Sequence, residues 1–413
     1  MNAVDQRLND SDLVSSASAD RSRHGAGAAD AKTDARFFKS TPQNPDSGSP
    51  ARCHIRLADE HTGIATLLTG LALLARSGRA ELSWECIPRP KPLQHGPWHL
   101  RDKGATNAEL VIDGRHRVFL DIHDSFELDE TAMASHDVYF KRSLRQDAVG
   151  AANRARLQAL GLVYAVHPDG FDREQLRRIM AGSGSTRQRG REMFRALASM
   201  TAAAINQGGR PTLSQLQGPP TRTRDPQVLF MVGLWDPALV PDIAPEKIAE
   251  FDAVNAMRAQ CVRALRREFG ARFHGGVQHT EFSRRRFADV LLEDDAEGSK
   301  RAFLQRVRHS AVCVTTTGLH GSNGWKLAEY VGLSRAIVSE PLRYHVPGGF
   351  AAGRHYLAFD SPDRCVEQVA RLMEHHDERD SMMESNERYA REWMHPERLA
   401  WRVINAARAG TRP

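Results

Sequence analysis

The sequence predicts an α/β protein with two doubly wound, Rossmann-like domains. Three observations lead to this prediction. The chain has 413 residues, which is enough for two domains of ordinary size. Short apolar, β-branched runs alternate with stretches of helical spacing, which is typical of parallel sheets covered by helices. A segment rich in Gly, Pro and Thr, residues 207–224, separates two such series and is predicted to be the interdomain linker.

The N-terminal segment, residues 1–50, is rich in Ser, Ala, Asp, Gly and Pro and has few large apolar side chains. It cannot bury enough surface to offset the entropy of ordering, so we predict that it is disordered. We place a first domain at residues 51–215 and a second at residues 225–385.

The first domain opens with the pattern of a βαβ unit. A strand is predicted at Cys53–Leu57, a helix at Gly63–Ser77 and a strand at Glu81–Ile87. Gly63 stands where the helix begins. On the sequence alone it could belong to a loop that approaches a ligand, or it could equally allow the helix to pack closely. Pro88–Asn107 contains four prolines and is predicted to be an irregular excursion.

A polar group follows the next predicted strand, Val118–Asp121. His123 and Asp124 come directly after it, at the strand end where α/β proteins form ligand sites. A histidine beside carboxylates can act as a base or donate to a reacting oxygen. The alternative is that the aspartates cap a helix and that His123 is packed or solvated. The D-x-x-D spacing is not a metal-binding D-x-D, and no metal site is predicted.

The rest of the first domain contains two more predicted strands, 137–141 and 162–166, with a helix-compatible stretch at 142–160 between them. Residues 173–195 then contain seven arginines and no interleaved aromatic pattern typical of nucleic-acid binding. This segment could attract an anionic acceptor or membrane surface, although a solvated basic face is the simpler interpretation.

The second domain begins with a predicted strand at Val228–Val232. Its further elements follow the same alternation of strand and helix. They are predicted at Pro245–Phe269 (helix), Ala271–Val277 (strand), Lys300–His309 (helix), Tyr356–Phe359 (strand), and Pro362–His376, Arg379–Trp393 and Pro396–Arg408 (helices).

The most informative stretch is Ala311–Leu342, which has the pattern of a complete βαβ unit. A strand at 311–316 leads through a glycine loop, Thr317–Gly324, into a helix at 325–333, and a second strand occupies 335–340. Such a crossover places the loop at the carboxyl end of a parallel sheet.

The loop has the chemistry of a phosphate or nucleotide site. Its glycines allow a ligand to approach the backbone, and the helix start presents N–H groups. His320 and Lys326 add donors, and Lys326 could neutralise a phosphate oxygen. Glu329, one turn further on, suits a neutral hydroxyl. The alternative is that the glycines only form a turn and that Glu329 is a solvated helix residue.

This stretch resembles the donor-binding half of GT-B glycosyltransferases of group 1, which have a Gly-rich loop, a helix that carries a glutamate and a strand of the form G-x-P-V-V. The matching residues are Lys326–Glu329 and Ser334–Val338. The sequence departs from the pattern where the family has an earlier paired glutamate, since Gly321 stands there. Gly233 occupies the place of a phosphate-binding arginine, so that role passes to Lys326, His320 or another arginine.

The resemblance implies two domains that face each other across a cleft, with C-terminal helices, residues 386–413, that return to the first domain. It implies that a hexose is transferred from a UDP- or GDP-sugar to an acceptor hydroxyl without a metal or other cofactor, and that Glu329 contacts the ribose. It leaves open whether the configuration at the anomeric carbon of the sugar is retained or inverted. The catalytic candidates are His123, Asp124 and Lys326, and the donor-binding candidates are Gly63, His320, Gly321, Ser322, Asn323, Gly324, Trp325, Lys326 and Glu329.

Composition limits the location and the partners. Hydrophobic residues make up 41% and charged residues 26%, as in globular proteins, and no run is long enough to span a bilayer. We therefore expect a cytoplasmic protein, with the inner face of the membrane as a candidate contact. The five scattered cysteines are predicted to be small buried hydrophobes rather than disulfides or metal ligands.

A net charge of +6 suggests an anionic partner, for which nucleotide phosphates, a membrane and nucleic acid all qualify. The acceptor is a glycan, lipid or protein of unspecified type, and no nucleic-acid recognition motif is present. Two rival functions remain: a non-catalytic sugar- or nucleotide-binding protein of the same fold, and a basic nucleic-acid-binding protein. A Rossmann dehydrogenase is less well supported, because no G-x-G-x-x-G follows a strand.

Overall fold

The computed structural model describes residues 49–58, 62–87, 107–145, 156–181, 186–204, 211–240 and 243–410. Most of the predicted disordered segment and of the predicted excursion at 88–107 lies outside these residues. The described chain forms two compact units. The first unit contains the residues up to Leu213 together with His345–Gly349 and the residues from Glu392 onward, and the second contains Ser214–Tyr344 and Phe350–Arg391.

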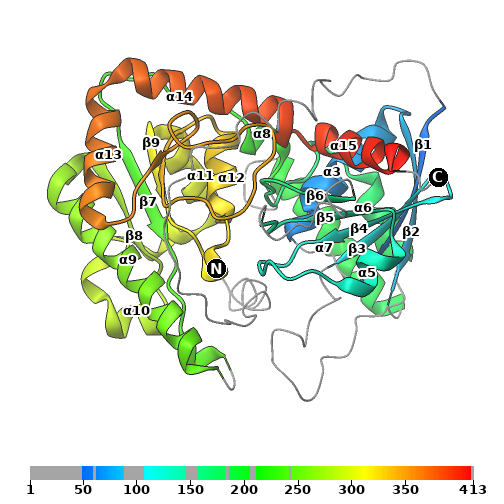
Figure 1. Ribbon diagram of the computed structural model, residues 1–413, viewed down its shortest axis with the longest axis horizontal. Helices are drawn as coiled ribbons and strands as arrows, with labels where there is room; N and C mark the ends of the chain where they lie inside the picture. Colours follow the sequence, from blue (N-terminus) through cyan, green and yellow to red (C-terminus); the bar gives the residue numbers. More distant parts are fainter. Residues whose placement is uncertain are drawn as a thin grey trace. The chain divides into compact units, whose positions relative to one another are not determined.

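The first unit is built on a six-stranded sheet of order β2-β1-β3-β4-β5-β6 (Figure 1). Only β3 runs antiparallel to its neighbours. The strands are β1 (Ala51–Leu57), β2 (Ala80–Cys86), β3 (Ala108–Ile112), β4 (His116–Asp121), β5 (Val138–Lys141) and β6 (Leu157–Ala159).

The sequence patterns did not predict β3, although a signal for it was present. Asp113 and Gly114 join β3 to β4, and both have positive φ angles, of 55° and 74°. An Asp-Gly pair in this conformation is typical of a tight β-hairpin turn, whose geometry matches the twist of antiparallel strands. The hairpin places β3 between β1 and β4, so this sheet is mixed rather than wholly parallel.

A second difference concerns the strand predicted at residues 162–166. The sheet is instead completed by β6, which lies within the stretch that had a helix-compatible pattern. The apolar run at 162–166 is buried against α3: the hydroxyls of Thr66 and Thr69 donate to the carbonyls of Tyr164 and Val166, both at 2.7 Å. The apolar pattern therefore reports burial beneath a helix, not pairing in a sheet.

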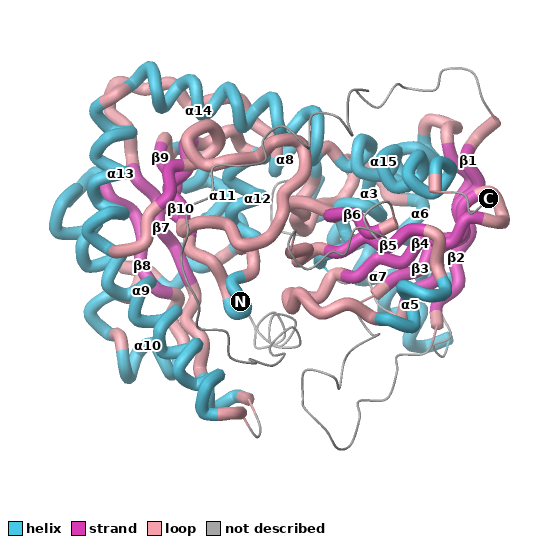
Figure 2. The backbone as a smooth tube through the Cα atoms, in the orientation of Figure 1, coloured by secondary structure: helices cyan, strands magenta, loops and turns pink. Residues whose placement is uncertain are grey.

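Helices cover both faces of this sheet (Figure 2). Helices α3 and α15 pack together on one face, and α5 lies against β4 and β5 on the other. A Cβ atom on Gly70 of α3 would lie 2.0 Å from the Pro396 carbonyl oxygen, so the glycine is required for the close approach of α15. The helices are α3 (Thr62–Arg76), α5 (Glu130–Ser135), α6 (Arg173–Ala181), α7 (Thr186–Ala204) and α15 (Pro396–Ala409).

The second unit has a wholly parallel sheet of order β11-β10-β9-β7-β8. Helices α9 and α13 pack together on one face, and α11 and α12 lie on the other (Figure 1). The elements are β7 (Val228–Val232), α9 (Pro245–Phe269), β8 (Phe273–Val277), α10 (Glu281–Arg286), α11 (Lys300–His309), β9 (Val312–Thr315), α12 (Trp325–Gly332), β10 (Ala336–Ser339), β11 (Leu357–Ala358), α13 (Pro362–Glu374) and α14 (His376–Tyr389). The short helix α8 (Leu213–Leu216) precedes them.

The predicted α/β class is confirmed, as is the return of the chain's last helix to the first unit. A one-turn π-helical segment, Ala390–Met394, joins α14 to α15, and Pro396 occupies the first turn of α15, where proline needs no hydrogen-bonding partner.

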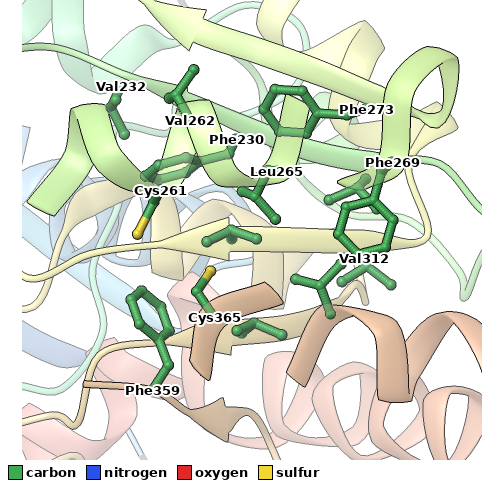
Figure 3. Packing of buried hydrophobic residues seen from close by; sticks show 14 of the residues in the cluster. Phe230, Val232, Cys261, Val262, Leu265, Phe269, Phe273, Val312, Phe359 and Cys365 are labelled. Carbon is green, nitrogen blue, oxygen red and sulfur yellow. The ribbon is translucent and has the colours of Figure 1, made fainter. Parts of the chain in front are cut away.

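The core of the second unit lies between its sheet and helices α9 and α13 (Figure 3). Cys261 and Cys365 lie within this core, and both are fully buried. Burial raises the pKa of the Cys313 thiol, on β9, to about 12. The predicted burial of the cysteines is confirmed for Cys53, Cys261, Cys313 and Cys365, whereas Cys86 is half-buried.

None of the helices in the described parts of the chain is both long enough and apolar enough to cross a membrane.

Candidate functional site

The strand order of the second sheet defines where a ligand site is expected. From β7 the chain proceeds outward to β8, and from β9 it proceeds in the opposite direction to β10 and β11. The order therefore reverses between the neighbouring strands β7 and β9. In open α/β sheets, ligands bind outside the carboxyl ends of the strands at such a point.

A buried arginine occupies this point. Arg258, from the middle of α9, donates to the Gly233 carbonyl after β7 (2.8 Å), and to the Thr316 hydroxyl (3.0 Å) and the Thr317 carbonyl (3.2 Å) after β9. Burial lowers the pKa of its guanidinium to about 10. No carboxylate of the described residues forms an ion pair with it. Arg258 therefore links the two loops and leaves a positive charge beneath them.

The third loop at this edge is attached through Glu340, which follows β10. Its carboxylate accepts from the backbone N–H of Thr317 (2.7 Å) and from the Thr317 hydroxyl (3.0 Å). Arg258 and Glu340 thus both hold the start of the glycine loop.

The glycine loop has the predicted place between β9 and α12, and its backbone is tightly turned. His320 and Gly321 have φ angles of 61° and 67°. A Cβ atom at position 321 would lie 2.6 Å from Cδ of Arg343. Both the conformation and the space favour glycine there, which accounts physically for the absence of the family's earlier glutamate at this position.

The side chain of His320 is engaged within the second unit. Its ring nitrogens lie 3.1 and 3.2 Å from Nζ of Lys247, which also forms an ion pair with Glu250. The backbone of His320 is fixed as well: its N–H donates to Glu250, and its carbonyl accepts from the Tyr344 hydroxyl at 2.7 Å. Burial lowers the pKa of Lys247. These contacts stabilise the left-handed turn.

The other predicted loop residues shape the entrance to α12. The Gly318 N–H donates to the Ser322 carbonyl at 2.9 Å, which closes the turn, and Ser322 is buried. Asn323 and Trp325 are half-buried. Gly324 is the N-cap residue of α12, and no side chain caps that helix among the described residues. Such a start favours an anion in front of it.

Lys326, in the first turn of α12, is half-buried and carries a displaced pKa. Burial lowers the pKa of its ammonium to about 8, and the positive charges of Lys300 and Arg258 act in the same direction, while Glu329 opposes them. Its Nζ lies 5.1 Å from the centre of the Phe303 ring. No carboxylate in the described residues contacts it. A second cation at this edge is therefore available to an anion.

Glu329 is buried, with 3% of its surface exposed, so its interpretation as a solvated helix residue is wrong. One carboxylate oxygen accepts from Lys300 of α11. The other, Oε2, is buried and accepts no hydrogen bond from the described part of the chain. An unpaired buried acceptor costs free energy unless a ligand or water satisfies it, so the atom points to a donor such as a hydroxyl.

The candidates of the first unit lie at the carboxyl edge of its own sheet. Gly63 is buried in the first turn of α3, after β1. The His123 N–H donates to Asp121 at 3.0 Å, and His123 is half-buried. Asp124 forms an ion pair with the buried Arg142. Neither aspartate caps the next helix, because Asp129 is the N-cap of α5.

A second ion pair involves Asp121, the residue that accepts the His123 N–H. Lys141, at the end of β5, contacts Asp121 at 2.8 Å, and both side chains are almost fully buried. The Tyr139 hydroxyl donates to the other oxygen of Asp121, and burial raises the pKa of this tyrosine far above its usual range. These partners hold the strand end from which His123 and Asp124 project.

The structure gathers the predicted residues from His320 to Glu329 at one edge of the second sheet, and Gly63, His123 and Asp124 at one edge of the first. The sequence did not indicate several residues that complete the first of these sites. They come from helices and loops distant in the chain, and they are Lys247, Glu250, Arg258, Lys300, Glu340 and Tyr344.

A family model described as glycosyl transferase-like matches residues 247–400 of the chain. The matched region begins in α9 and contains the glycine loop, α12 and Glu340. The predicted resemblance is thereby confirmed for the region that holds this site. A comparison with curated protein sequences gives no significant match.

Solved structures with a similar fold are distant. The C-terminal domain of the group 1 glycosyl transferase LpcC from Francisella tularensis is 9% identical and covers 43% of this chain and 95% of its own, with a TM-score of 0.28. HepE of Anabaena, solved with UDP-glucose, is 10% identical over 86% of this chain and 100% of its own, with a TM-score of 0.35. The UDP-GlcNAc 2-epimerase of Neisseria meningitidis, solved with UDP-GlcNAc, is 10% identical over 82% and 70%, with a TM-score of 0.31. At these scores the likenesses assign nothing to this chain.

Proposed function

We propose that this protein, whose residues 247–400 match a glycosyl transferase-like model, transfers a hexose from a nucleoside-diphosphate sugar to an acceptor hydroxyl. The observation that carries the proposal is that three groups lie at one sheet edge: Arg258 and Lys326, which form no ion pair with a described carboxylate, and the Oε2 atom of Glu329, which accepts no hydrogen bond from the described residues. A nucleoside diphosphate combines the two chemistries that such an edge would recognise, an anionic diphosphate and a ribose with neutral hydroxyls.

In this proposal the diphosphate lies in front of the glycine loop and α12. Lys326 approaches one of its oxygens, the N–H groups at the start of α12 donate to it, and Arg258 contributes its charge from below. Negative charge grows on the diphosphate as the bond to the sugar breaks. Fixed cations and dipoles that face this charge stabilise the transition state more than the ground state, and that difference is what accelerates transfer.

The ribose in this proposal donates a hydroxyl to Oε2 of Glu329. Lys300 holds the other oxygen of that carboxylate, so the acceptor atom is oriented before the donor arrives. The reaction as proposed requires no metal, because the lysine, the arginine and the helix start act on the leaving group. UDP- and GDP-sugars are the donor classes we propose.

The first unit would supply the acceptor side. His123 is the proposed base or donor toward the acceptor or the sugar, because Asp121 receives its backbone N–H and thereby fixes the residue. Asp124 is already paired with Arg142, so we assign it the lesser role of shaping the pocket and of keeping that arginine in place.

The first experiment is thermal unfolding of the full chain alone and with UDP, GDP, ADP, dTDP and CMP. A ligand present at about 100 times its Kd stabilises the folded state by about 2.7 kcal/mol, which is readily measured. We expect a shift selective for one nucleoside diphosphate, followed by release of that diphosphate from the corresponding sugar donors when acceptors are supplied. If no nucleotide shifts the transition, the site assignment fails.

One observation favours a second candidate, a sugar- or nucleotide-binding protein without turnover. Both carboxylates near His123 form ion pairs, Asp121 with Lys141 and Asp124 with Arg142, and the paired cation weakens the field by which a carboxylate would make the histidine a stronger base. The same nucleotide panel distinguishes the two functions. A selective shift without diphosphate release, across glycan, lipid and protein acceptors, would support the binding protein.

A further inference from the structure

Helix α7 of the first unit has one side that nothing in the described structure covers. Met193, Ala196 and Met200 are at least partly buried and mark its inner side. The opposite side is exposed and spans about 160° of the helix circumference at about 100° per residue. We call the five large exposed residues of this side the α7 face: Arg187, Arg191, Phe194, Arg195 and Leu197.

The α7 face carries large apolar side chains in water. Phe194 is 74% exposed and Leu197 is 39% exposed. Two further exposed apolar residues belong to the neighbouring helix α6: Phe171 lies just before it and Met180 lies in its last turn. The Met180 carbonyl accepts from Arg189 of α7 at 3.3 Å. Single exposed apolar residues are ordinary, but most of those found in the described chain gather on these two helices. Their clustering points to a partner.

The charges of the α7 face are of one sign. Arg187, Arg191 and Arg195 form no ion pair with any described residue. The acidic residue of α7, Glu192, is half-buried and accepts from Gln188 at 3.0 Å. An uncompensated row of guanidinium groups beside exposed Phe and Leu side chains is complementary to a surface with anionic groups outside and hydrocarbon beneath.

The sequence interpretation found no aromatic residues interleaved with these arginines, but it overlooked Phe194. Phe194 lies between Arg191 and Arg195 and is the most exposed large apolar residue described. A solvated basic face would not place it there. Single-stranded nucleic acid also binds aromatic and basic side chains. However, Leu197 and Met180 cannot act as stacking platforms for bases, whereas both can enter the acyl region of a membrane.

We propose that the α7 face docks the protein on an anionic phospholipid bilayer, with Phe194 and Leu197 inserted at the headgroup boundary and the three arginines paired with lipid phosphates. This inference does not depend on glycosyl transfer. It concerns a surface formed by α7, and the residues assigned to the nucleotide site come from other elements.

The test uses the full chain and sedimentation with phosphatidylcholine vesicles that contain or lack phosphatidylglycerol. We expect binding only to the anionic vesicles, and weaker binding at high salt. Phe194→Ser should reduce the partition coefficient at least about tenfold, because its apolar contact is lost at any salt concentration. Arg191→Gln should reduce it about fivefold at low salt and less at high salt.

Matched controls come from the second unit. Leu239 is 61% exposed, and the side chain of Arg285 is 64% exposed. Leu239→Ser and Arg285→Gln should leave vesicle binding unchanged. All four variants alter exposed side chains and should keep the wild-type unfolding temperature. The proposal is overturned if the anionic vesicles do not bind the protein, if Phe194→Ser binds as wild type, or if the α7 variants lose single-stranded DNA binding but not vesicle binding.

Discussion

The two sheets differ at the place where their strand order reverses. In the second sheet the neighbouring strands β7 and β9 are parallel, and their carboxyl ends frame Arg258. In the first sheet an antiparallel strand, β3, is inserted between β1 and β4. A parallel pair at a reversal leaves a crevice outside the strand ends, whereas an inserted strand fills that position.

The charges follow the same division. At the edge of the first sheet each aspartate has a cation of its own, Lys141 for Asp121 and Arg142 for Asp124. At the edge of the second sheet neither Arg258 nor Lys326 forms an ion pair with a described carboxylate, and one oxygen of Glu329 accepts no hydrogen bond from the described residues. The polar groups of the first edge are used to hold strands together. Those of the second edge are left partly uncompensated, as a ligand site requires.

The largest expected effect is the loss of stability caused by Lys141→Met in the first sheet. The substitution leaves the Asp121 carboxylate buried with no cation, which typically costs about 3–5 kcal/mol of unfolding free energy. Hydrogen exchange of the β4 and β5 amides should accelerate accordingly, and the unfolding temperature should fall.

Two results would decide whether this pair is structural, as we interpret it. The double variant with Asp121→Asn removes the uncompensated charge and should recover much of the stability. The nucleoside diphosphate should still stabilise each of these variants under conditions in which the variant folds. If Lys141→Met left stability unchanged and instead abolished nucleotide binding, the contrast between the two edges would be reversed.

In the second unit, Lys326→Met should affect the reaction rather than the fold. Removing one preorganised cation that faces a developing charge typically lowers kcat about 10²–10³-fold, or about 2.7–4 kcal/mol. Because burial already disfavours the charged form of Lys326, the variant should unfold at the same temperature as wild type or higher. Steady-state kinetics and thermal unfolding of the same preparation measure both effects.

Lys326→Arg is the matched variant, because it retains the charge and changes the shape of the group. We expect it to keep more activity than Lys326→Met. Equal kcat for wild type and Lys326→Met would remove this lysine from the mechanism and leave Arg258 as the cation at the reversal point.

Glu329→Gln should weaken donor binding by about 1.5–3 kcal/mol, the value of a hydrogen bond to a charged acceptor. Isothermal titration with the nucleoside diphosphate measures this loss. Glu297 provides a control, because it is also a carboxylate in an ion pair. It precedes α11 and pairs with Arg306 of that helix. If Glu297→Gln weakened binding as much as Glu329→Gln, the loss would reflect general destabilisation and not a contact with the ribose.

The sequence predicted well those parts that depend on local pattern. The strand, glycine loop, helix and strand of residues 311–340 were predicted within one or two residues of their observed bounds, because apolar runs, glycines and helical spacing all lie within one short stretch. Helices α9 and α11 were predicted at their observed bounds for the same reason. Local pattern fails where pairing is distant, as for the strand predicted at 162–166, whose apolar residues contact α3.

The cation at the reversal point could not be predicted in this way. Arg258 is one of several arginines in a long helix, and its partners are 25, 58 and 59 positions away in the chain. Nothing in the neighbouring residues distinguishes it from a solvated arginine. The ion pair of Lys300 with Glu329, 29 positions apart, is hidden for the same reason. By contrast, the Asp113-Gly114 turn before β4 was a readable local signal for β3.

The smallest expected effect is a pH dependence of nucleotide affinity. It should arise at the edge of the second sheet and not at that of the first. The pKa of Lys326 in the free protein is about 8, well below that of an exposed lysine. An anion bound beside it favours the charged form, so binding requires a proton on Lys326. Affinity for the nucleoside diphosphate should therefore be nearly constant below about pH 7 and fall about tenfold between pH 7 and pH 9.

Stability of the free protein should change in the opposite direction over the higher range. Between about pH 8 and the usual lysine pKa, the unfolded chain binds a proton at Lys326 that the folded chain has lost, so this residue makes the folded state more stable as pH rises. Lys326→Met should abolish both dependences, whereas Lys141→Met at the first edge should leave the pH dependence of nucleotide affinity intact. A wild-type affinity that stays constant from pH 7 to pH 9 would place the lysine outside the diphosphate's reach, and the electrostatic difference between the two edges would then depend on Arg258 alone.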